Sequence, residues 1–240
     1  SAEKITFILI ALKIVIAEHM KETIPYKITS DAFPSDMKVP EKHPLHAILR
    51  ANEYQLDRET LRYEPFIDRS RLDELKYLHE EAFPVIYSSE FYNKLAAKRH
   101  NIIVVYGDIH LTNKDNNSEN KVLRDTMIGF ISYELRDLKR SEWACLLHKF
   151  FGIFKPFHSV SILTLAVMFE FRGKGIASAL LENLISMIKE QGKVISLNLH
   201  VIEHNKEAIA FYKKNNFTET EYLQDFYFLN GKFYGAYKFS

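Results

Sequence analysis

A short glycine-containing segment has the clearest chemical potential in this sequence. Residues 169–178 read FEFRGKGIAS; they follow a strand-like run, Ser159–Met168, and lead into a helix-like run, Gly175–Gln191. Small residues at such a turn allow main-chain N–H groups to point outward together, where the positive end of the helix dipole favours an anion. Arg172 and Lys174 add positive charge at the same place. The segment therefore predicts a site for a phosphorylated ligand.

A second chemical candidate is His200, within the strand predicted for Val194–Val201. Apolar residues alternate along one side of this strand, and Asn198 and His200 point to the other side. The ordinary pKa of a histidine lies close to physiological pH, as a general base requires. A lone histidine in a strand can equally be structural.

The elements that must position these residues alternate between strand and helix. Asn205 is a suitable N-cap for a helix over Lys206–Lys214, which Asn215 and Asn216 would end. Two strands are expected in Phe217–Phe239 around the Asn230-Gly231 turn. Upstream, we predict strands at Leu61–Ile67, Asn101–Tyr106 and Thr126–Leu135, and helices at Ser70–Phe83 and Ser89–Lys98. This order is typical of a mixed α/β fold.

Composition limits the possible classes of protein. The chain has 240 residues, of which 47% are hydrophobic and 26% charged, as in a globular protein with a sizeable core. The net charge of +1 gives no support for binding nucleic acid. The single cysteine, Cys145, excludes an intrachain disulfide and favours a reducing, cytoplasmic location. The histidines do not cluster with carboxylates at ligand spacing, so no metal site is predicted.

We divide the chain into an N-terminal arm, residues 1–60, and a domain, residues 61–240. Residues 18–60 contain four prolines and little periodicity, with one short helix expected near Leu45–Tyr54. The apolar segment Ile5–Ala17 is too short to span a bilayer alone; it is either packed on the core or the remnant of a signal anchor.

Two further segments lie outside the regular pattern. The polar loop at 112–120 has a composition typical of disorder. Residues 141–154 contain a stripe of tryptophan, leucine and phenylalanine at helical spacing. Such a stripe either packs on the core of the protein or docks on a membrane surface or a partner protein.

Several motifs together resemble one enzyme family. They are Arg172-x-x-Gly175-x-Ala177, Leu199-His200-Val201, Asn205, Ala208-Ile209-x-Phe211-Tyr212 and Asn216-Phe217, with Phe83-Pro84-Val85-x-Tyr87 upstream and Tyr222-Leu223-x-x-Phe226-Tyr227 downstream. This set is similar to the GNAT acetyltransferases, and the last two blocks resemble N-alpha-acetyltransferases of the NatE and NatF type. The resemblance covers roughly residues 61–240 and implies the GNAT fold, a mixed sheet of about seven strands with about four helices.

The resemblance also implies acetyl-CoA as the cofactor, with its pantetheine along the strand at Leu163–Met168. The N–H of Leu165 would stabilise the oxyanion, and the phenol of Tyr212 would lie beside the departing sulfur. Tyr212 could instead be an aromatic residue of the core, and Asn205 is in any case suited to cap a helix. The implied cofactor-binding residues are Leu165, Val167, Arg172, Gly173, Lys174, Gly175, Ile176, Ala177, Ser178, Asn205 and Tyr212.

By the same resemblance, the substrate is the α-amino group of a protein N terminus, with methionine and then an apolar residue first. His200 would act as the base through a water, and the peptide would be lined by Phe83, Val85, Tyr87, Phe226 and Tyr227. Ser161 stands where these relatives have a tyrosine that shares the base role. His200 therefore works alone, or Tyr87, Tyr222 or Tyr227 fills the gap, or activity is weak.

Three functional hypotheses follow. The first is an N-terminal protein acetyltransferase, and the second is a GNAT enzyme that acts on lysine side chains or a small amine. The third is a binding module that holds acetyl-CoA, has lost its chemistry at Ser161 and works through a docking helix at 141–154.

Overall fold

A computed structural model describes residues 44–83, 101–112, 121–137, 158–191, 194–229 and 232–240. The strands are β1 (Glu53–Pro65), β2 (Asn101–Thr112), β3 (Lys121–Asp137), β4 (His158–Val167), β5 (Val194–Ile202), β6 (Glu219–Leu229) and β7 (Lys232–Phe239). The helices are α2 (Pro44–Ala51), α3 (Leu72–Ala82), α6 (Ile176–Gln191) and α7 (Lys206–Lys214), with short 3₁₀ turns η1 (Arg69–Arg71) and η2 (Phe169–Phe171). The predicted mixed α/β fold is confirmed.

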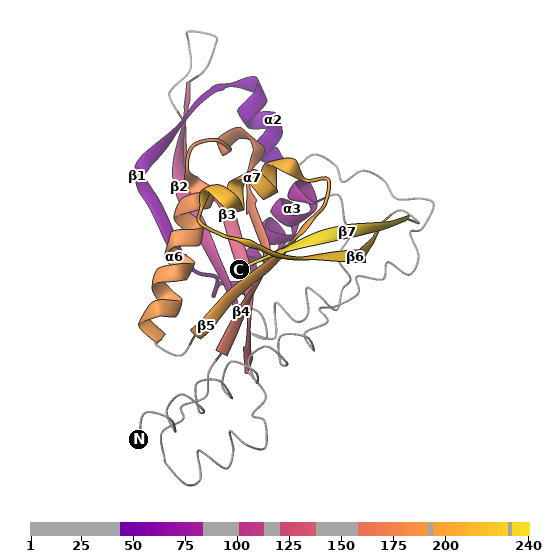
Figure 1. The fold of residues 1–240 in the computed structure, drawn as a ribbon. Coiled ribbons are helices and arrows are strands. Elements are labelled where there is room, and N and C mark those ends of the chain that lie inside the picture. The colour runs from indigo at the N-terminus through magenta and orange to yellow at the C-terminus, as the bar shows by residue number, and fades with distance from the viewer. Residues whose placement is uncertain (1–43, 84–100, 113–120, 138–157, 192–193, 230–231) are drawn as a thin grey trace, which may run out of the picture.

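The seven strands form one sheet in the order β1-β2-β3-β4-β5-β7-β6. All neighbouring strands are antiparallel except β4 and β5, which run parallel. Parallel neighbours need a crossover connection, and α6 supplies it. The N-terminus of α6 therefore lies at the carboxyl end of β4, and the β6–β7 hairpin projects from the rest of the sheet (Figure 1).

The helices α3 and α6 pack on opposite faces of the sheet. Phe130 of β3 stacks on His79 of α3, with ring centroids 5.6 Å apart. Tyr133, three residues along the same strand and so on its other face, reaches the sulfur of Met187 in α6 at 3.8 Å. The apolar face predicted for α6 is buried, with Leu180, Leu181 and Leu184 each at most 1% exposed.

The start of the sheet differs from the prediction. The strand expected at Leu61–Ile67 is the second half of β1, which begins at Glu53, so residue 60 lies inside this strand. The pairing of β1 with β2 shifts register between Asp57 and Arg62. This irregularity interrupts the alternation of apolar residues, which is why the sequence pattern reveals only the later half. The predicted short helix is confirmed as α2.

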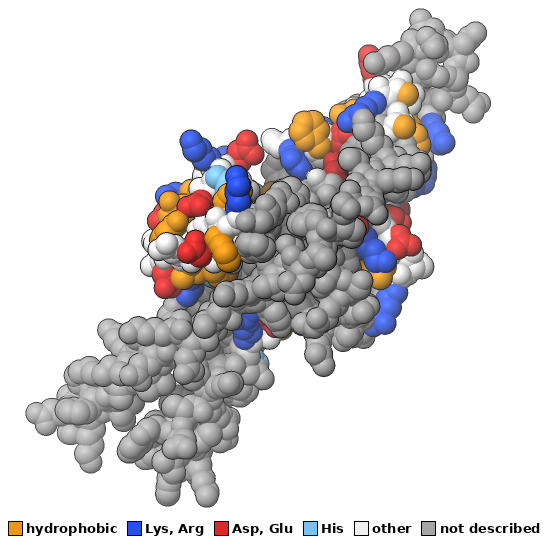
Figure 2. All heavy atoms as spheres, turned by 90° about the vertical axis from the view of Figure 1, so that its right-hand side faces the viewer, with side chains coloured by type: hydrophobic (Ala, Val, Ile, Leu, Met, Phe, Trp, Pro, Cys, Tyr) orange, Lys and Arg blue, Asp and Glu red, His pale blue; other side chains and the backbone are white. Residues whose placement is uncertain are grey.

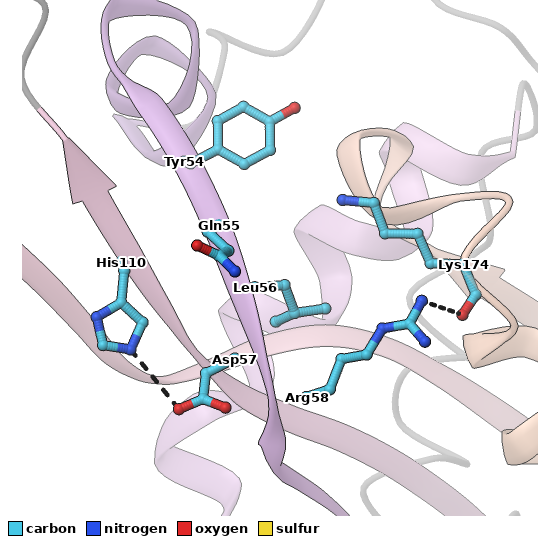
Figure 3. Close-up of a pocket in the computed structure, with 7 residues that line it drawn as sticks. All are labelled: Tyr54, Gln55, Leu56, Asp57, Arg58, His110 and Lys174. Carbon is cyan, nitrogen blue, oxygen red and sulfur yellow. Dashed lines mark hydrogen bonds and ion pairs between the residues drawn. The ribbon is translucent and has the colours of Figure 1, made fainter.

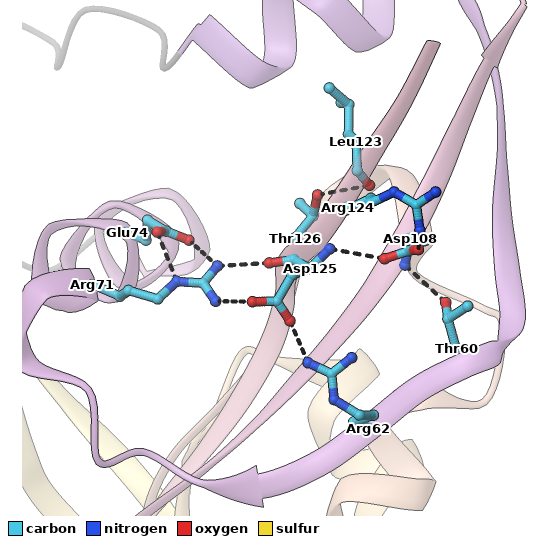
Figure 4. Close-up of polar contacts among 9 residues, drawn as sticks. All are labelled: Thr60, Arg62, Arg71, Glu74, Asp108, Leu123, Arg124, Asp125 and Thr126. Atoms are coloured by element: carbon cyan, nitrogen blue, oxygen red, sulfur yellow. Dashed lines mark hydrogen bonds and ion pairs between the residues drawn. The ribbon is translucent and has the colours of Figure 1, made fainter. Parts of the chain in front are cut away.

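A network of charged side chains joins β1, α3 and β3 at this irregularity (Figure 4). The guanidinium of Arg71 donates to both carboxylate oxygens of Glu74, at 2.9 and 2.7 Å, and to the carboxylate of Asp125 at 2.7 Å. Arg62 also pairs with Asp125, which has a left-handed backbone with φ of 53°. The main-chain N–H of Asp125 in turn donates to Asp108 at 2.8 Å. These arginines are occupied in holding strands together and so are poor candidates for anion binding.

Several sequence predictions fall outside the described residues. They are the apolar segment Ile5–Ala17, the helix at Ser89–Lys98, the polar loop beyond Thr112, and the aromatic stripe at 141–154. The cytoplasmic location and the docking role of the stripe therefore stay predictions. In the described part of the chain, no helix has the length and apolar character to cross a membrane. On the face that Figure 2 shows, acidic and basic side chains of the described residues are interspersed, in keeping with the small net charge.

Candidate active site

The site begins where β4 and β5 separate. These strands pair from His158 to Ser161 and from Val194 to Asn198, and the described chain shows no pairing of residues 162–167 with β5. Beyond this point β5 pairs with β7 instead, through Leu199–Ile202. Leu165 lies in the separated part of β4, opposite Ile131 of β3. The separation leaves main-chain groups between two strands available to an extended ligand.

The turn after β4 is built as an anion site. Gly173 and Gly175 have φ of 73° and 84°, a left-handed backbone that favours glycine. A Cβ added at either position would meet no atom within 4 Å, so the backbone and not crowding requires glycine here. The first main-chain bond of α6 runs from the N–H of Ala179 to the carbonyl of Gly175 at 3.0 Å. The N–H groups of Ile176, Ala177 and Ser178 thus precede the helical ladder and can bind a phosphate.

Arg172 is fixed beside these N–H groups. Its Nε donates to the carbonyl of Val167 at 3.0 Å, and its guanidinium lies 5.5 Å from the ring centroid of Phe169. In the part of the chain that the structure describes, its two terminal nitrogens have no hydrogen-bond partner. A guanidinium held in this way presents a preorganised pair of donors to a phosphate.

An open groove runs along the β1 side of the turn (Figure 3). Lys174 extends into it, with its ammonium 5.9 Å from the ring centroid of Tyr54 and 5.0 Å from that of Phe171. Arg58 enters from β1 and donates to the main-chain carbonyl of Lys174 at 3.3 Å. Sequence reasoning missed Tyr54 and Arg58 because it placed them in the arm. The alternation of Tyr54 and Leu56 was the available signal, and the register shift after Asp57 obscured it.

His200 lies in a largely buried environment near two cations, Lys238 and Arg136, which pair with Glu221 at 3.9 Å and Glu134 at 2.8 Å. Burial, followed by the charges of Lys238 and Arg136, lowers the pKa of its imidazole to about 4. Lys238 is the residue opposite His200 on β7, and its side chain is only 10% exposed. The imidazole is therefore neutral at physiological pH, but it is a weaker base than the ordinary pKa expected from the sequence would make it.

The hairpin brings two predicted lining residues to His200. The ring of Phe226 stacks on the imidazole, with centroids 4.7 Å apart and planes 19° from parallel. The hydroxyl of Tyr227 donates to the main-chain carbonyl of His200 at 3.4 Å. Phe83 lies at the end of α3, where its ring contacts that of His79 with centroids 4.9 Å apart, and its role in lining the peptide stays a prediction. Val85 and Tyr87 lie outside the described residues.

Tyr212 and Asn205 have the structural roles expected of them. The ring of Tyr212 is 7% exposed and packs among Phe211, Phe217 and Phe239. Burial raises the pKa of its phenol well above the ordinary value, so the hydroxyl keeps its proton at neutral pH. Asn205 caps α7 by accepting from the N–H of Ala208 at 3.0 Å. Their contacts with a cofactor stay predictions.

The polar side chains around Ser161 form a network at the point where β4 and β5 diverge. Asn198 donates to Ser159 at 3.0 Å and to Ser196 at 3.1 Å, and it accepts from the hydroxyl of Ser240 at 2.7 Å. Ser161 is half-buried opposite Asn198. Of the tyrosines that could replace a missing phenol, Tyr222 is bound to Glu203 at 2.7 Å, whereas Tyr227 lies at His200.

Comparison with known proteins agrees with this geometry. The sequence profile of the acetyltransferase (GNAT) family matches residues 72–217, more than half of the chain. The protein belongs to the GNAT acetyltransferase family. Histone acetyltransferase MCC1 of Arabidopsis thaliana is 30% identical over 75% of this chain and 69% of its own length. N-alpha-acetyltransferase 60 of Xenopus tropicalis is 28% identical over 72% of this chain and 66% of its own length, slightly less than two thirds.

Solved structures of GNAT proteins show the same fold. Arabidopsis thaliana NAA60 bound to a bisubstrate analogue superposes with a TM-score of 0.60 at 28% identity, covering 75% of this chain and 97% of that one. The same protein bound to acetyl-CoA gives a TM-score of 0.57 at 28% identity over the same shares. Arabidopsis thaliana Naa50 bound to CoA-Ac-MVNAL gives 0.54 at 26% identity, again over 75% and 97%. This GNAT protein is an enzyme that uses acetyl-CoA.

The residues present fit that cofactor. The exposed N–H groups at the start of α6 and the guanidinium of Arg172 suit its pyrophosphate, and the separation of β4 from β5 suits its pantetheine. Lys174 contributes charge from the neighbouring groove, with Arg58 bonded to its carbonyl.

Replacing Gly175 with alanine tests this cradle. The new methyl group meets no protein atom but forces a left-handed backbone on alanine and projects into the open space at the turn. We expect the Kd for acetyl-CoA, measured by calorimetry, to rise at least about tenfold, since charge-assisted hydrogen bonds to phosphate are lost. Asn216→Ala is the matched control, because Asn216 also has a positive φ, 65°, but lies at the end of α7. Equal affinity in the parent protein and Gly175→Ala would disprove the cradle.

Proposed function

We propose that this GNAT enzyme transfers the acetyl group of acetyl-CoA to the α-amino group of protein N termini that begin with methionine and an apolar residue. The main support is the aromatic wall over His200. Phe226 stacks on the imidazole, and Tyr227 is bonded to the same residue. An apolar first side chain would pack on such a wall while its amine reaches the imidazole through a water. Relatives named N-alpha-acetyltransferase 60, and the Naa50 complex whose analogue contains the sequence MVNAL, agree with this substrate.

The residues of this chain would act on protons and on position. Acetyl-CoA, when bound, supplies the thioester carbonyl that the amine attacks. The positive charges of Lys238 and Arg136 favour loss of a proton from the bound ammonium, and the neutral imidazole of His200 accepts that proton. With a pKa of about 4, the imidazole is a weaker base than an unperturbed histidine and would pass this proton on to water. The protonated phenol of Tyr212 would donate to the leaving sulfur, and the N–H of Leu165 would bind the carbonyl oxygen.

Acetylation of lysine side chains is the alternative, because the relative at 30% identity is named a histone acetyltransferase. A lysine side chain places its amine at the end of a long flexible stem. An N-terminal amine lies directly beside the first side chain, which the wall at Phe226 and Tyr227 would contact. This difference favours the N terminus.

Paired peptides distinguish the two activities. Each pair has one peptide with a free N terminus, beginning Met-Val or Met-Leu, and a blocked copy that contains an internal lysine. We expect turnover of acetyl-CoA on the free N termini and little on the blocked copies. Acetylation of the blocked lysine peptides alone would replace the proposed substrate. Binding of acetyl-CoA without turnover of either peptide would favour the binding-module hypothesis.

A further inference from the structure

The β6–β7 hairpin contains a bulge next to the active site. Leu223 pairs with Ala236, and the next pair is Tyr227 with Tyr234. Between these pairs β6 has three residues, 224–226, whereas β7 has only Gly235. Asp225 in the bulge has a left-handed backbone with φ of 54°. The bulge thus interrupts the ladder directly before Tyr227 and includes Phe226.

Glu203, the residue after β5, holds the opposite side of this bulge. Its carboxylate accepts the hydroxyl of Tyr222 at 2.7 Å and the main-chain N–H of Gly235 at 2.9 Å. Its own main-chain N–H donates to the carbonyl of Gly235 at 3.0 Å. A Cβ on Gly235 would lie only 2.1 Å from the hydroxyl oxygen of Tyr222, so glycine is required for this approach. We call these contacts among Glu203, Tyr222 and Gly235 the Glu203 bridge.

The Glu203 bridge and the aromatic wall of Phe226 and Tyr227 both join the end of β5 to the β6–β7 hairpin. His200 and Glu203 lie three residues apart at the end of β5, and each is contacted by the hairpin. Tyr222 precedes the bulge on β6. Phe226, in the bulge, and Tyr227, directly after it, contact His200. The hydroxyl of Tyr222, and then the N–H of Gly235, lower the pKa of Glu203, so the carboxylate is ionised at neutral pH. A charged acceptor makes both hydrogen bonds stronger than a neutral one would.

We propose that Glu203 is a positioning residue for the peptide substrate, because its carboxylate fixes the β6 bulge and thereby holds Phe226 and Tyr227 over His200. This inference rests on the proposed function and adds a determinant of peptide affinity to it. The bridge has no part in the cofactor turn, which begins at the carboxyl end of β4. Loss of the bridge should therefore weaken peptide binding and leave the affinity for acetyl-CoA unchanged.

Three variants remove the contacts in steps. Glu203→Ala removes both side-chain bonds, Glu203→Gln keeps one carbonyl oxygen, and Tyr222→Phe removes only the hydroxyl. We expect the KM for the Met-Val peptide to rise about tenfold or more in Glu203→Ala and less in the other two variants, because hydrogen bonds to a charged group are lost. The Kd for acetyl-CoA should stay within about twofold of the parent, a difference well below the free energy of one such bond.

Glu219→Gln is the matched control. It removes a carboxylate from β6, the strand that contains the bulge, but this carboxylate pairs with Lys213 at 3.1 Å and lies outside the bulge. We expect its peptide KM to equal that of the parent. An unchanged peptide KM in Glu203→Ala would overturn the proposal. A parallel loss of acetyl-CoA affinity would do so as well, because it would show general damage to the domain.

Hydrogen exchange at the amide of Gly235, measured without any substrate, separates this proposal from the proposed function. Faster exchange in Glu203→Ala and Tyr222→Phe than in Glu219→Gln supports the bridge. Equal exchange in all three disproves it. The proposed function fails on a different result, namely a parent protein that acetylates no free N terminus. If the parent instead acetylates lysine peptides, a rise in KM for those peptides in Glu203→Ala still supports a positioning role, and an unchanged KM refutes it.

Discussion

Replacing His200 with alanine is expected to lower kcat on a Met-Val peptide by about 10²-fold or more, the usual contribution of a positioned general base. The imidazole is neutral and lies against Phe226 at the end of β5, where the amine must lose its proton. The cofactor turn lies between β4 and α6 and does not include His200, so the Kd for acetyl-CoA should not change. Steady-state kinetics and calorimetry measure these two quantities separately. An unchanged kcat would exclude His200 as the base.

The pH dependence of the parent enzyme checks the same assignment. The pKa of His200 lies near 4, so its protonation should not limit the rate above about pH 6. Between pH 6 and 9, kcat/KM should rise with pH through the α-amine of the free peptide, whose pKa is about 8. An inflection near pH 6.5 that disappears in His200→Ala would show instead that the environment leaves the imidazole with its ordinary pKa.

The second large effect is expected for Tyr212→Phe. The substitution keeps the ring that packs among Phe211, Phe217 and Phe239 and removes only the hydroxyl. Since burial keeps this phenol protonated, it can donate to the departing sulfur but cannot serve as a base. We expect kcat to fall about 10²-fold, in the range of a general acid, with little change in Tm or in the KM for peptide.

Tyr133→Phe is the control for Tyr212→Phe. Tyr133 is another buried tyrosine, and among the residues that the structure describes its hydroxyl donates to the sulfur of Met187, at 3.8 Å. Its removal should leave kcat unchanged. If Tyr212→Phe also retained full kcat, the phenol would have only the packing role that its burial already explains.

Local features of the site are determined by neighbouring residues and could be predicted from the sequence. The turn at Arg172–Ser178, the N-cap at Asn205 and the paired strands around residues 230–231 depend on glycine, asparagine and periodicity within a few positions. The placement of His200 on the less apolar side of β5 also follows from the two-residue period of a strand.

Long-range pairing decided the rest. The separation of β4 from β5 depends on β7 pairing with the end of β5, which brings residues as far apart as Leu199 and Phe239 into register. The low pKa of His200 arises first from burial and then from Lys238 and Arg136 on two other strands. Neither effect leaves a local pattern, because each depends on which strands become neighbours.

Irregular backbone explains the remaining differences between the sequence and the fold. The register shift between Asp57 and Arg62 hid the first half of β1, and with it Arg58 beside the cofactor turn. The bulge in β6 similarly conceals the link between Glu203 and Gly235, which are separated by 32 residues. The sequence by itself therefore determined the family, the phosphate-binding turn and the candidate base. Only the tertiary structure decided the burial and the charges around His200, and the contacts that hold Phe226 and Tyr227 over it. Both depend on residues that folding brings together.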